Sequence, residues 1–276
     1  MFKILFYSLT FILGTCIGSF LNCVIYRIWE NKSFLKGRSF CPKCKHTLGF
    51  ADLVPIFSFL SLKGKCRYCK EKISLQYPLV ELITGLLFVF VINFIFLNPQ
   101  LFPSFSQSII TVLFYWFFVS ILIIVFIYDL KHYLIPDGVV YLGIFGALGL
   151  NLIQDFLFNH STLQYFSDFI TFKGLISGIL ASGFFLAIVL FSRGKWMGLG
   201  DVKFAFFMGM LLTPSAVLLG LFLAFFIGAT IGIGIVLLGK KKFKDEIPFG
   251  PFLVIGTFFA LFFANQIISW YFNIFI

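Results

Sequence analysis

Two aspartates lie where hydrophobic segments of the chain meet more polar sequence. Asp129 begins the sequence Asp-Leu-Lys-His-Tyr-Leu-Ile-Pro, and Asp201 ends the sequence Gly-Leu-Gly-Asp. A carboxylate at a membrane boundary loses hydration and is tolerated mainly where the protein uses it, and glycine and proline mark turns. Both acids are therefore candidates for chemistry.

The positions of these acids predict a catalytic pair. We expect Asp129 to end the third hydrophobic helix and Asp201 to open the sixth, at the same end of a bundle. Two nearby carboxyl groups can share one proton, so that the ionised acid deprotonates water while the neutral acid polarises a carbonyl group. Helix ends favour a neutral Asp129, at a C-terminus, and an ionised Asp201, at an N-terminus. Because Gly194, Gly198 and Gly200 leave room for an extended peptide, the pattern predicts an intramembrane aspartyl peptidase.

Each acid alone also has a simpler interpretation. Either one could cap a helix or pair with Lys131 or Lys203. His132 could orient the carboxyl group of Asp129 or be an ordinary boundary side chain. Asp137 follows a proline just before a hydrophobic segment, which favours a helix N-cap. Only the arrangement of the two acids in space separates these interpretations from catalysis.

Four cysteines predict a metal site. Two Cys-x-x-Cys pairs are separated by 21 residues, and their members are Cys41, Cys44, Cys66 and Cys69. Each pair on a tight turn can direct two thiolates at one tetrahedral ion, and four sulfur ligands fill the coordination shell. A disulfide is disfavoured in a reducing cytoplasm, and a redox relay needs only one pair. We therefore predict structural zinc, which supports a loop too poor in apolar residues to fold alone.

The composition indicates a polytopic membrane protein. Hydrophobic residues make up 60% of the 276 residues and charged residues only 12%, with 43 phenylalanines, and the mean hydropathy is +1.03. This leaves too little polar surface for a soluble globule. Apolar segments near the roughly 20 residues that cross a bilayer lie at 4–28, 79–97, 109–128, 139–157, 170–192, 202–213, 215–238 and 250–272. We predict an all-α membrane protein with about eight transmembrane helices and a small zinc domain between the first two.

The positive charge is concentrated in one loop. From Arg27 to Tyr77 there are eleven Lys or Arg residues against three acids, a local charge of +8 within a total of +10. A basic block between membrane helices is typical of a cytoplasmic loop and not of a nucleic-acid site. In this orientation the segments 129–138, 193–201 and 239–249 also face the cytoplasm, and the amino terminus lies outside. Both aspartates then lie at the cytoplasmic face.

Six motifs, in order and with matching spacing, resemble those of the bacterial type IV prepilin peptidases. These are bifunctional leader peptidases and N-methyltransferases of the Gly-x-Gly-Asp membrane aspartyl protease group. The motifs are Gly18-Ser-Phe-Leu-Asn-Cys-Val-Ile-Tyr-Arg27, the two Cys-x-x-Cys pairs, Tyr77-Pro-Leu-Val-Glu-Leu-Ile-Thr-Gly85, the Asp129 segment, Gly198-Leu-Gly-Asp-Val-Lys203 and Ile247-Pro-Phe-Gly-Pro-Phe252. The resemblance runs nearly end to end and is specific, whereas Gly-x-Gly-Asp alone would be weak.

The resemblance implies that Asp129 and Asp201 are the catalytic pair and that the four cysteines bind zinc. It implies a prepilin or pseudopilin substrate, with a short basic leader that is cleaved after glycine at the cytoplasmic face of the inner membrane. It also implies that the new amino terminus is methylated with S-adenosylmethionine. The candidate cofactor-binding residues are Asn22, Arg27 and Glu81, polar residues at the membrane edge, and helix packing is the alternative for all three.

The resemblance divides the chain into a first transmembrane helix at 1–28, a cytoplasmic tetracysteine domain at 29–78 and a peptidase bundle at 79–276. The segment 247–252 could bind the substrate backbone beside the aspartates or simply turn the chain into the last helix. Two other functions stay open. One is a peptidase without methyl transfer, whose zinc domain recognises substrate. The other is a transporter or assembly scaffold, although transporter acids usually lie near the midplane on broken helices in repeated halves.

Overall fold

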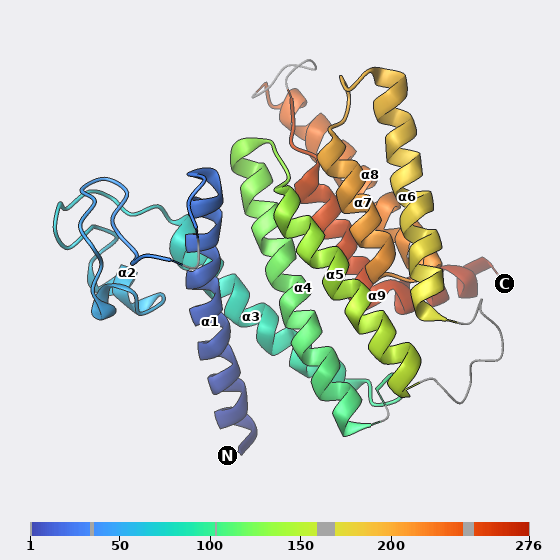
Figure 1. The fold of residues 1–276 in the computed structure, drawn as a ribbon, viewed down its shortest axis with the longest axis horizontal. Coiled ribbons are helices and arrows are strands. Elements are labelled where there is room, and N and C mark those ends of the chain that lie inside the picture. The colour runs from blue at the N-terminus through green and yellow to red at the C-terminus, as the bar shows by residue number, and fades with distance from the viewer. Residues whose placement is uncertain (1, 34–35, 103, 159–168, 240–245, 276) are drawn as a thin grey trace. The chain divides into compact units, whose positions relative to one another are not determined.

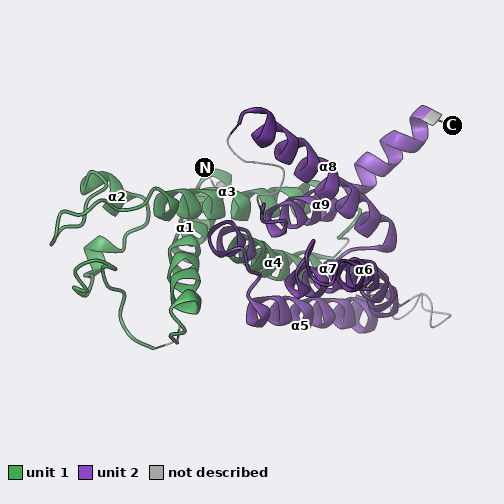
Figure 2. Ribbon diagram, turned by 90° about the horizontal axis from the view of Figure 1, so that it is seen from above, with its two compact units in different colours: residues 1–124 green, residues 125–276 purple. Residues whose placement is uncertain are grey.

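The protein is described by a computed structural model that covers residues 2–33, 36–102, 104–158, 169–239 and 246–275. The chain divides into two compact units, Met1–Ile124 and Val125–Ile276, which Figure 2 colours separately. The predicted domain boundaries at residues 28 and 78 stay a prediction.

The first unit contains two paired helices and a small loop-rich domain between them. Helices α1 (Phe2–Trp29) and α3 (Gln76–Leu97) pack against each other. The start of α4 (Phe105–His132) also belongs to this unit, and the indole N–H of Trp116 donates to the Phe88 carbonyl at 3.0 Å. The elements appear in chain order in Figure 1. Long apolar helices therefore frame the domain that carries the cysteines.

The domain between α1 and α3 has little regular structure. It contains a 3-10 turn, η1 (Phe50–Asp52), and a five-residue helix, α2 (Phe57–Ser61). Two isolated antiparallel bridges, Phe40 with Thr47 and Lys65 with Lys72, each enclose one Cys-x-x-Cys pair. The scarcity of regular elements agrees with the prediction that a metal supplies much of the folding energy.

The second unit is a helical bundle that begins with the end of α4. It continues with α5 (Asp137–Ile153), a π-helical turn η2 (Gln154–Phe158), α6 (Ile170–Ser192), α7 (Leu199–Leu211), α8 (Pro214–Leu237) and α9 (Gly250–Phe275). Helix α7 packs on α6, and α9 packs on α8. A Cβ on Gly209 of α7 would meet the backbone of Gly178 in α6, so only glycine permits this approach. The close packing fixes the start of α7, where Asp201 lies.

The predicted fold class is confirmed. Each of the eight predicted segments coincides with a long part of one helix. In the described part of the chain, seven helices are long and apolar enough to cross a membrane. The sixth predicted segment forms α7, whose 13 residues extend about 20 Å, short of the ~30 Å hydrocarbon core. It is therefore a helix within the bundle and too short to span the hydrocarbon alone.

Candidate active site

Asp129 lies inside α4, because the helix continues to His132. Its side chain is buried, with 4% of the residue exposed. One carboxylate oxygen accepts the backbone N–H of Gly250 at 2.9 Å, and Gly250 is the first residue of α9. The N–H groups of a helix start carry partial positive charge. The last helix of the chain therefore directs its positive end at this acid.

Asp201 lies in the first turn of α7, three residues after the N-cap Gly198. Its carboxylate accepts the backbone N–H of Gly198 at 3.1 Å. The negative charge of Asp129 acts on this carboxyl group through space. The ends of α4, α7 and α9 thus bring two carboxyl groups into one electrostatic site within the second unit.

The prediction that Asp129 is neutral and Asp201 ionised was based on the helix ends, and the structure does not support that basis. It placed Asp129 at a negative helix C-terminus and Asp201 at a positive N-terminus. In the structure each carboxyl group accepts an N–H from a helix start, Gly250 for one and Gly198 for the other. Each of these hydrogen bonds favours the ionised form of its acid, while burial disfavours it, so the helix ends do not distinguish the two acids.

Lys203, a possible ion-pair partner of Asp201, pairs instead with Asp137. The Lys203 Nζ atom lies 2.6 Å from an Asp137 carboxylate oxygen, and it also lies 5.7 Å from the centre of the Tyr141 ring. The predicted N-cap at Asp137 is wrong, because Pro136 occupies the N-cap position and Asp137 is the first helical residue. The ring of His132 lies 4.8 Å from that of Tyr128.

Open space adjoins two of the glycines that precede Asp201 in the sequence. A Cβ at Gly194 would meet no atom within 4 Å, and a Cβ at Gly198 would meet only the Asp201 carboxylate at 3.8 Å and the Gly200 nitrogen at 3.9 Å. Gly200 is different, since its Cβ would lie 3.0 Å from Ile135. Two of the three glycines therefore leave the space that an approaching peptide backbone needs.

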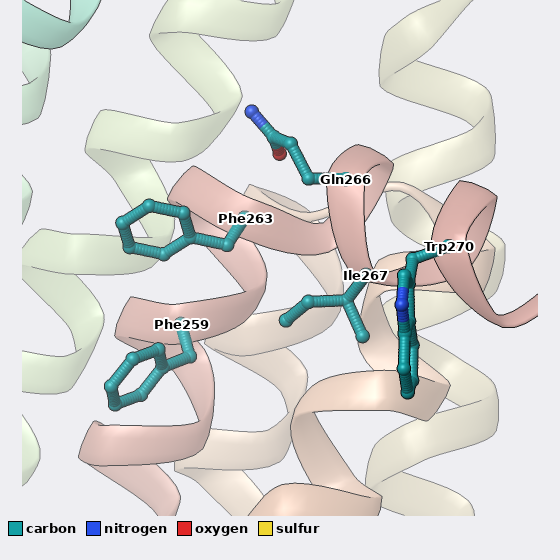
Figure 3. A pocket seen from close by; sticks show the side chains of 5 residues that line it. All are labelled: Phe259, Phe263, Gln266, Ile267 and Trp270. Carbon is teal, nitrogen blue, oxygen red and sulfur yellow. The ribbon is translucent and has the colours of Figure 1, made fainter.

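An apolar pocket of about 320 Å³ lies on the second half of α9, and its side chains are shown in Figure 3. It is lined by Phe259, Phe263, Gln266, Ile267 and Trp270. The lining contains one amide and no acid, so this pocket offers no group for hydrolysis.

The predicted metal ligands are brought together in the first unit. The ligand atoms of Cys41, Cys44, Cys66 and Cys69 all lie within 4.8 Å of one another. Each pair sits on the same turn, in which Cys41 accepts from the N–H of Lys45 and Cys66 from that of Lys70. Both lysines adopt positive φ, 59° and 61°. The repeated turn aims two thiols per pair at one point, and the cluster can bind a metal ion.

The surroundings of Cys66 favour its thiolate form. The backbone N–H of Cys69 donates to the Cys66 thiol, and this bond with that from Tyr68 outweighs burial, so that the pKa of Cys66 is lowered to about 7. The backbone hydrogen bond from Glu71 lowers the pKa of Cys69, but burial and hydrogen bonds with the other three cysteines outweigh it and raise that pKa to about 11. Thiolates are the form that binds metals. Cys41 and Cys66 are buried, while Cys44 and Cys69 are exposed, so the site lies at the surface of the domain.

The three candidate cofactor residues are all buried and all have partners within the first unit. Arg27 donates to four backbone carbonyls, those of Ser33, Lys36, Gly37 and Arg38. Asn22 donates to the carbonyls of Gly18 and Tyr77 and accepts from Gln76. Glu81 accepts the N–H of Ile56 at 2.7 Å. Each has a structural role, and their contact with a cofactor stays a prediction.

The sequence reasoning missed Asp155. This fully buried acid lies in the π-helical turn after α5. Its carboxylate accepts the backbone N–H groups of Ile170 and Thr171 at 2.7 and 2.9 Å and the Thr171 hydroxyl at 2.6 Å. It therefore caps the start of α6 across 15 residues of sequence. A lone acid in an apolar segment was the only available signal.

Asp52 was also missed as a structural acid. Its carboxylate accepts from the Arg67 Nε at 2.7 Å, the Tyr68 hydroxyl at 3.1 Å and the Gly49 N–H at 3.1 Å. Burial tends to raise the pKa of Asp52, but the Arg67 and Gly49 hydrogen bonds prevail and lower it. The side chain ties the 3-10 turn to the second cysteine pair.

Comparison with known proteins follows the same division of the chain. Residues 12–95 match the family model of the bacterial peptidase A24 N-terminal domain, and residues 116–233 match that of the type IV leader peptidase family. The second match contains both aspartates, and the first contains the four cysteines. No solved structure matches.

Several relatives match over nearly their full length. A prepilin leader peptidase/N-methyltransferase of Aeromonas salmonicida is 32% identical, with 97% of this chain and 94% of the relative covered. The corresponding protein of Bacillus subtilis is 32% identical, with 96% and 97% covered. That of Pseudomonas aeruginosa is 29% identical, with 95% and 92% covered. With the two aspartates at one site and the cysteine cluster in its own domain, this chain belongs to the type IV leader peptidase family.

Proposed function

We propose that this protein cleaves the leader peptide of type IV prepilins or pseudopilins after glycine and then N-methylates the new amino terminus. Asp129 and Asp201 are the catalytic pair. The observation that carries the proposal is the convergence of two carboxyl groups, from α4 and α7, beside the start of α9. The names of the relatives, which state both activities, support the same function.

The chemistry follows from one proton shared between two acids. The ionised carboxyl group takes a proton from water, which attacks the scissile carbonyl carbon, while the neutral acid donates its proton to the carbonyl oxygen. The tetrahedral intermediate then collapses: the C–N bond breaks, the acid that took the proton from water gives it to the leaving amine, and the other carboxylate takes back the proton from the hydroxyl group. The N–H groups of Gly250 and Gly198 stabilise the negative charge that the pair retains. Open space beside Gly194 and Gly198 admits the extended substrate.

We propose zinc as the metal of the cysteine cluster. Cys41, Cys44, Cys66 and Cys69 would hold the ion, and four thiolates in a tetrahedral shell suit zinc. Such a shell leaves no ligand position for water, so the ion would stabilise the domain without taking part in hydrolysis. Its binding would supply folding energy to a segment with little regular structure.

The methyl donor S-adenosylmethionine would supply the methyl group in the second reaction. We place its binding at the junction of α1 and α3, with Asn22, Arg27 and Glu81 as candidates. One observation supports this location: the side-chain oxygen of Gln76 is buried without a hydrogen-bond partner, although the Gln76 amide donates to Asn22 at 3.2 Å. An unpaired buried acceptor is costly and can receive an N–H group of a ligand.

The chain is a multi-pass protein of the bacterial inner membrane, and we propose that its active site faces the cytoplasm. The +8 charge between Arg27 and Tyr77 supports this orientation through the positive-inside bias. Labelling of Lys43→Cys with a membrane-impermeant thiol reagent, in intact cells and in inverted membranes, tests it. Labelling only in inverted membranes is expected, against the background of the native cysteines.

The enzymatic proposal is tested with membranes that contain the protein and a prepilin substrate, with and without S-adenosylmethionine. Mass spectrometry reads the products for the parent, Asp129→Asn and Asp201→Asn. We expect cleavage after glycine that both substitutions abolish, and a gain of one methyl group only when the cofactor is present. Intact prepilin with the parent protein, or cleavage that survives both substitutions, would favour the transporter or scaffold function.

A peptidase without methyl transfer is the second candidate, since Asn22, Arg27 and Glu81 each make hydrogen bonds that support the fold of the first unit. Replacing the four cysteines with serine separates the two functions. Cleavage that persists while methylation is lost assigns the cysteine domain to methyl transfer. Loss of cleavage with retained methylation of a pre-cleaved substrate assigns it to substrate recognition.

A further inference from the structure

The cysteine domain exposes large apolar side chains that its own core does not use. Phe50 is 90% exposed, Phe57 73% and Leu60 63%. They lie outside the membrane-length helices, on the two short helices η1 and α2. By contrast, the ring of neighbouring Phe59 packs on Gly64 within the domain. Exposed apolar groups of this size mark an interaction surface.

These side chains repeat at the spacing of one helical face. Phe50 and Leu53 are three residues apart, and so are Phe57 and Leu60. Residues at this spacing point to the same side of a helical turn. Leu53 is also exposed, at 38%. We call residues 50–60 the apolar segment, since its two helical turns both carry outward-facing hydrophobic groups.

A hydrogen bond fixes this segment at the level of the membrane boundary. Ile56, between the two turns, donates its N–H to Glu81 at 2.7 Å. Glu81 is five residues after Gln76, where α3 begins, which is about 7.5 Å along the helix axis. The 22 residues of α3 extend about 33 Å, close to the ~30 Å hydrocarbon thickness. The segment therefore lies beside the first turns of a membrane helix and not out in the solvent.

The backbone of Ile56 is strained in this position. Its φ of 63° is rare for a β-branched residue, which normally avoids the left-handed region. Such a conformation persists only where other contacts hold it, and the Glu81 carboxylate supplies one. The hydrogen bond to Glu81 therefore helps to hold Ile56 in this conformation, beside the first turns of α3.

The charge of the domain complements an anionic surface. Two of its three acids are in ion pairs, Glu30 with Lys32 and Asp52 with Arg67. Exposed lysines follow the apolar segment at Lys63, Lys65, Lys70 and Lys72. A basic residue near an anionic bilayer favours binding to it. Exposed apolar groups next to uncompensated lysines are typical of segments that lie in the headgroup region.

We propose that the apolar segment, residues 50–60, inserts into the headgroup region of the bilayer, and that the lysines after it bind anionic phospholipid headgroups. The partner is thus the surface of the membrane that α1 and α3 cross. This arrangement holds the cysteine domain flat against the bilayer. The proposal is independent of the peptidase reaction, because it uses contacts of the first unit only.

The test places tryptophan in the segment and measures its depth in lipid nanodiscs. Variants Phe50→Trp and Phe57→Trp are compared with Lys43→Trp, an exposed position on the first cysteine turn, after subtraction of the signal of the parent protein. Phospholipids brominated near the headgroup quench nearby tryptophan. We expect stronger quenching and bluer emission at positions 50 and 57 than at position 43, and weaker quenching of these two by aqueous acrylamide.

The lysine contribution is tested in the Phe57→Trp background. Quenching by the brominated phospholipids should rise when phosphatidylglycerol replaces phosphatidylcholine, and it should fall as the salt concentration increases. A triple change of Lys63, Lys65 and Lys72 to Gln should remove that lipid dependence while leaving α1 and α3 intact. Equal quenching at 43, 50 and 57, or no quenching at 50 and 57, would overturn the proposal. So would emission that shifts only when a hydrophobic helical peptide is added, since the partner would then be a protein.

Discussion

The contact between Gly250 and Asp129 makes the Gly250→Ala variant a sharp test of the active-site geometry. An added Cβ would lie 2.6 Å from the Asp129 carboxylate oxygen and 3.0 Å from its carboxyl carbon. Ordinary contacts between such atoms are about 3.5–4 Å. The start of α9 or the carboxyl group must therefore move by about 1 Å, which is enough to break a 2.9 Å hydrogen bond.

The magnitude follows from the bond that is lost. A hydrogen bond to a charged group is worth about 1.5–3 kcal/mol, and each 1.4 kcal/mol is about tenfold in rate. We expect kcat for prepilin cleavage to fall about 10- to 150-fold, with KM little changed because Asp129 acts on the reacting bond. A misplacement of about 1 Å at a reacting group has a cost of similar size, about 100-fold.

The assay is the initial rate of prepilin cleavage in membranes, read by mass spectrometry. Methylation of a pre-cleaved substrate serves as a control for folding, because the proposed cofactor site lies in the first unit, whereas Gly250 lies in the second. Gly183→Ala in α6 is the matched variant, since a Cβ there meets no atom within 4 Å. Wild-type cleavage by Gly250→Ala would refute the role of the α9 N–H, and a loss of methylation as well would point to misfolding.

Three further predictions concern the supporting structure. Asp155→Asn leaves one acceptor oxygen for three donors and should lower the free energy of unfolding by about 1–3 kcal/mol, seen as a lower thermal midpoint; an unchanged midpoint would refute the cap. Lys203→Gln breaks a pair with exposures of 32% and 55%, worth at most about 1 kcal/mol, so cleavage should change less than about fivefold. A loss as large as that of Asp201→Asn would mean that Lys203 acts on the aspartate pair. Metal chelation should raise hydrogen exchange across residues 40–72 and leave the second unit protected, and unchanged exchange would contradict a structural metal.

The helical segments were predictable because bilayer thickness constrains them strongly. Hydropathy located α1 and α3 to α9 but not the short helices η1 and α2, and the spacing of the cysteines predicted a cluster that the structure assembles. The ends of helices were harder. Hydropathy ended the third helix at residue 128, whereas α4 extends to His132 because helical hydrogen bonding continues past the apolar stretch. Because of that difference of one turn, Asp129 lies inside the helix and not at its end.

Contacts that depend on the folding of loops and on helix packing could not be predicted from periodicity. The four carbonyls around Arg27 become acceptors only once the following loop has folded back on α1. Lys203 was a possible ion-pair partner of Asp201, its neighbour in sequence, but it pairs with Asp137. Motif spacing indicates which groups are available, while packing decides which of them meet.

The hydrogen bond between Asp129 and Gly250 joins residues 121 positions apart, and this has a consequence for biosynthesis. A nascent chain that has passed residue 201 already holds both acids, yet it still lacks the helix start that supports one of them. The site is complete only after the last helix has entered the bilayer. We therefore expect a chain that ends before Gly250 to cleave prepilin more slowly than the full-length protein, because its Asp129 carboxylate lacks this hydrogen bond.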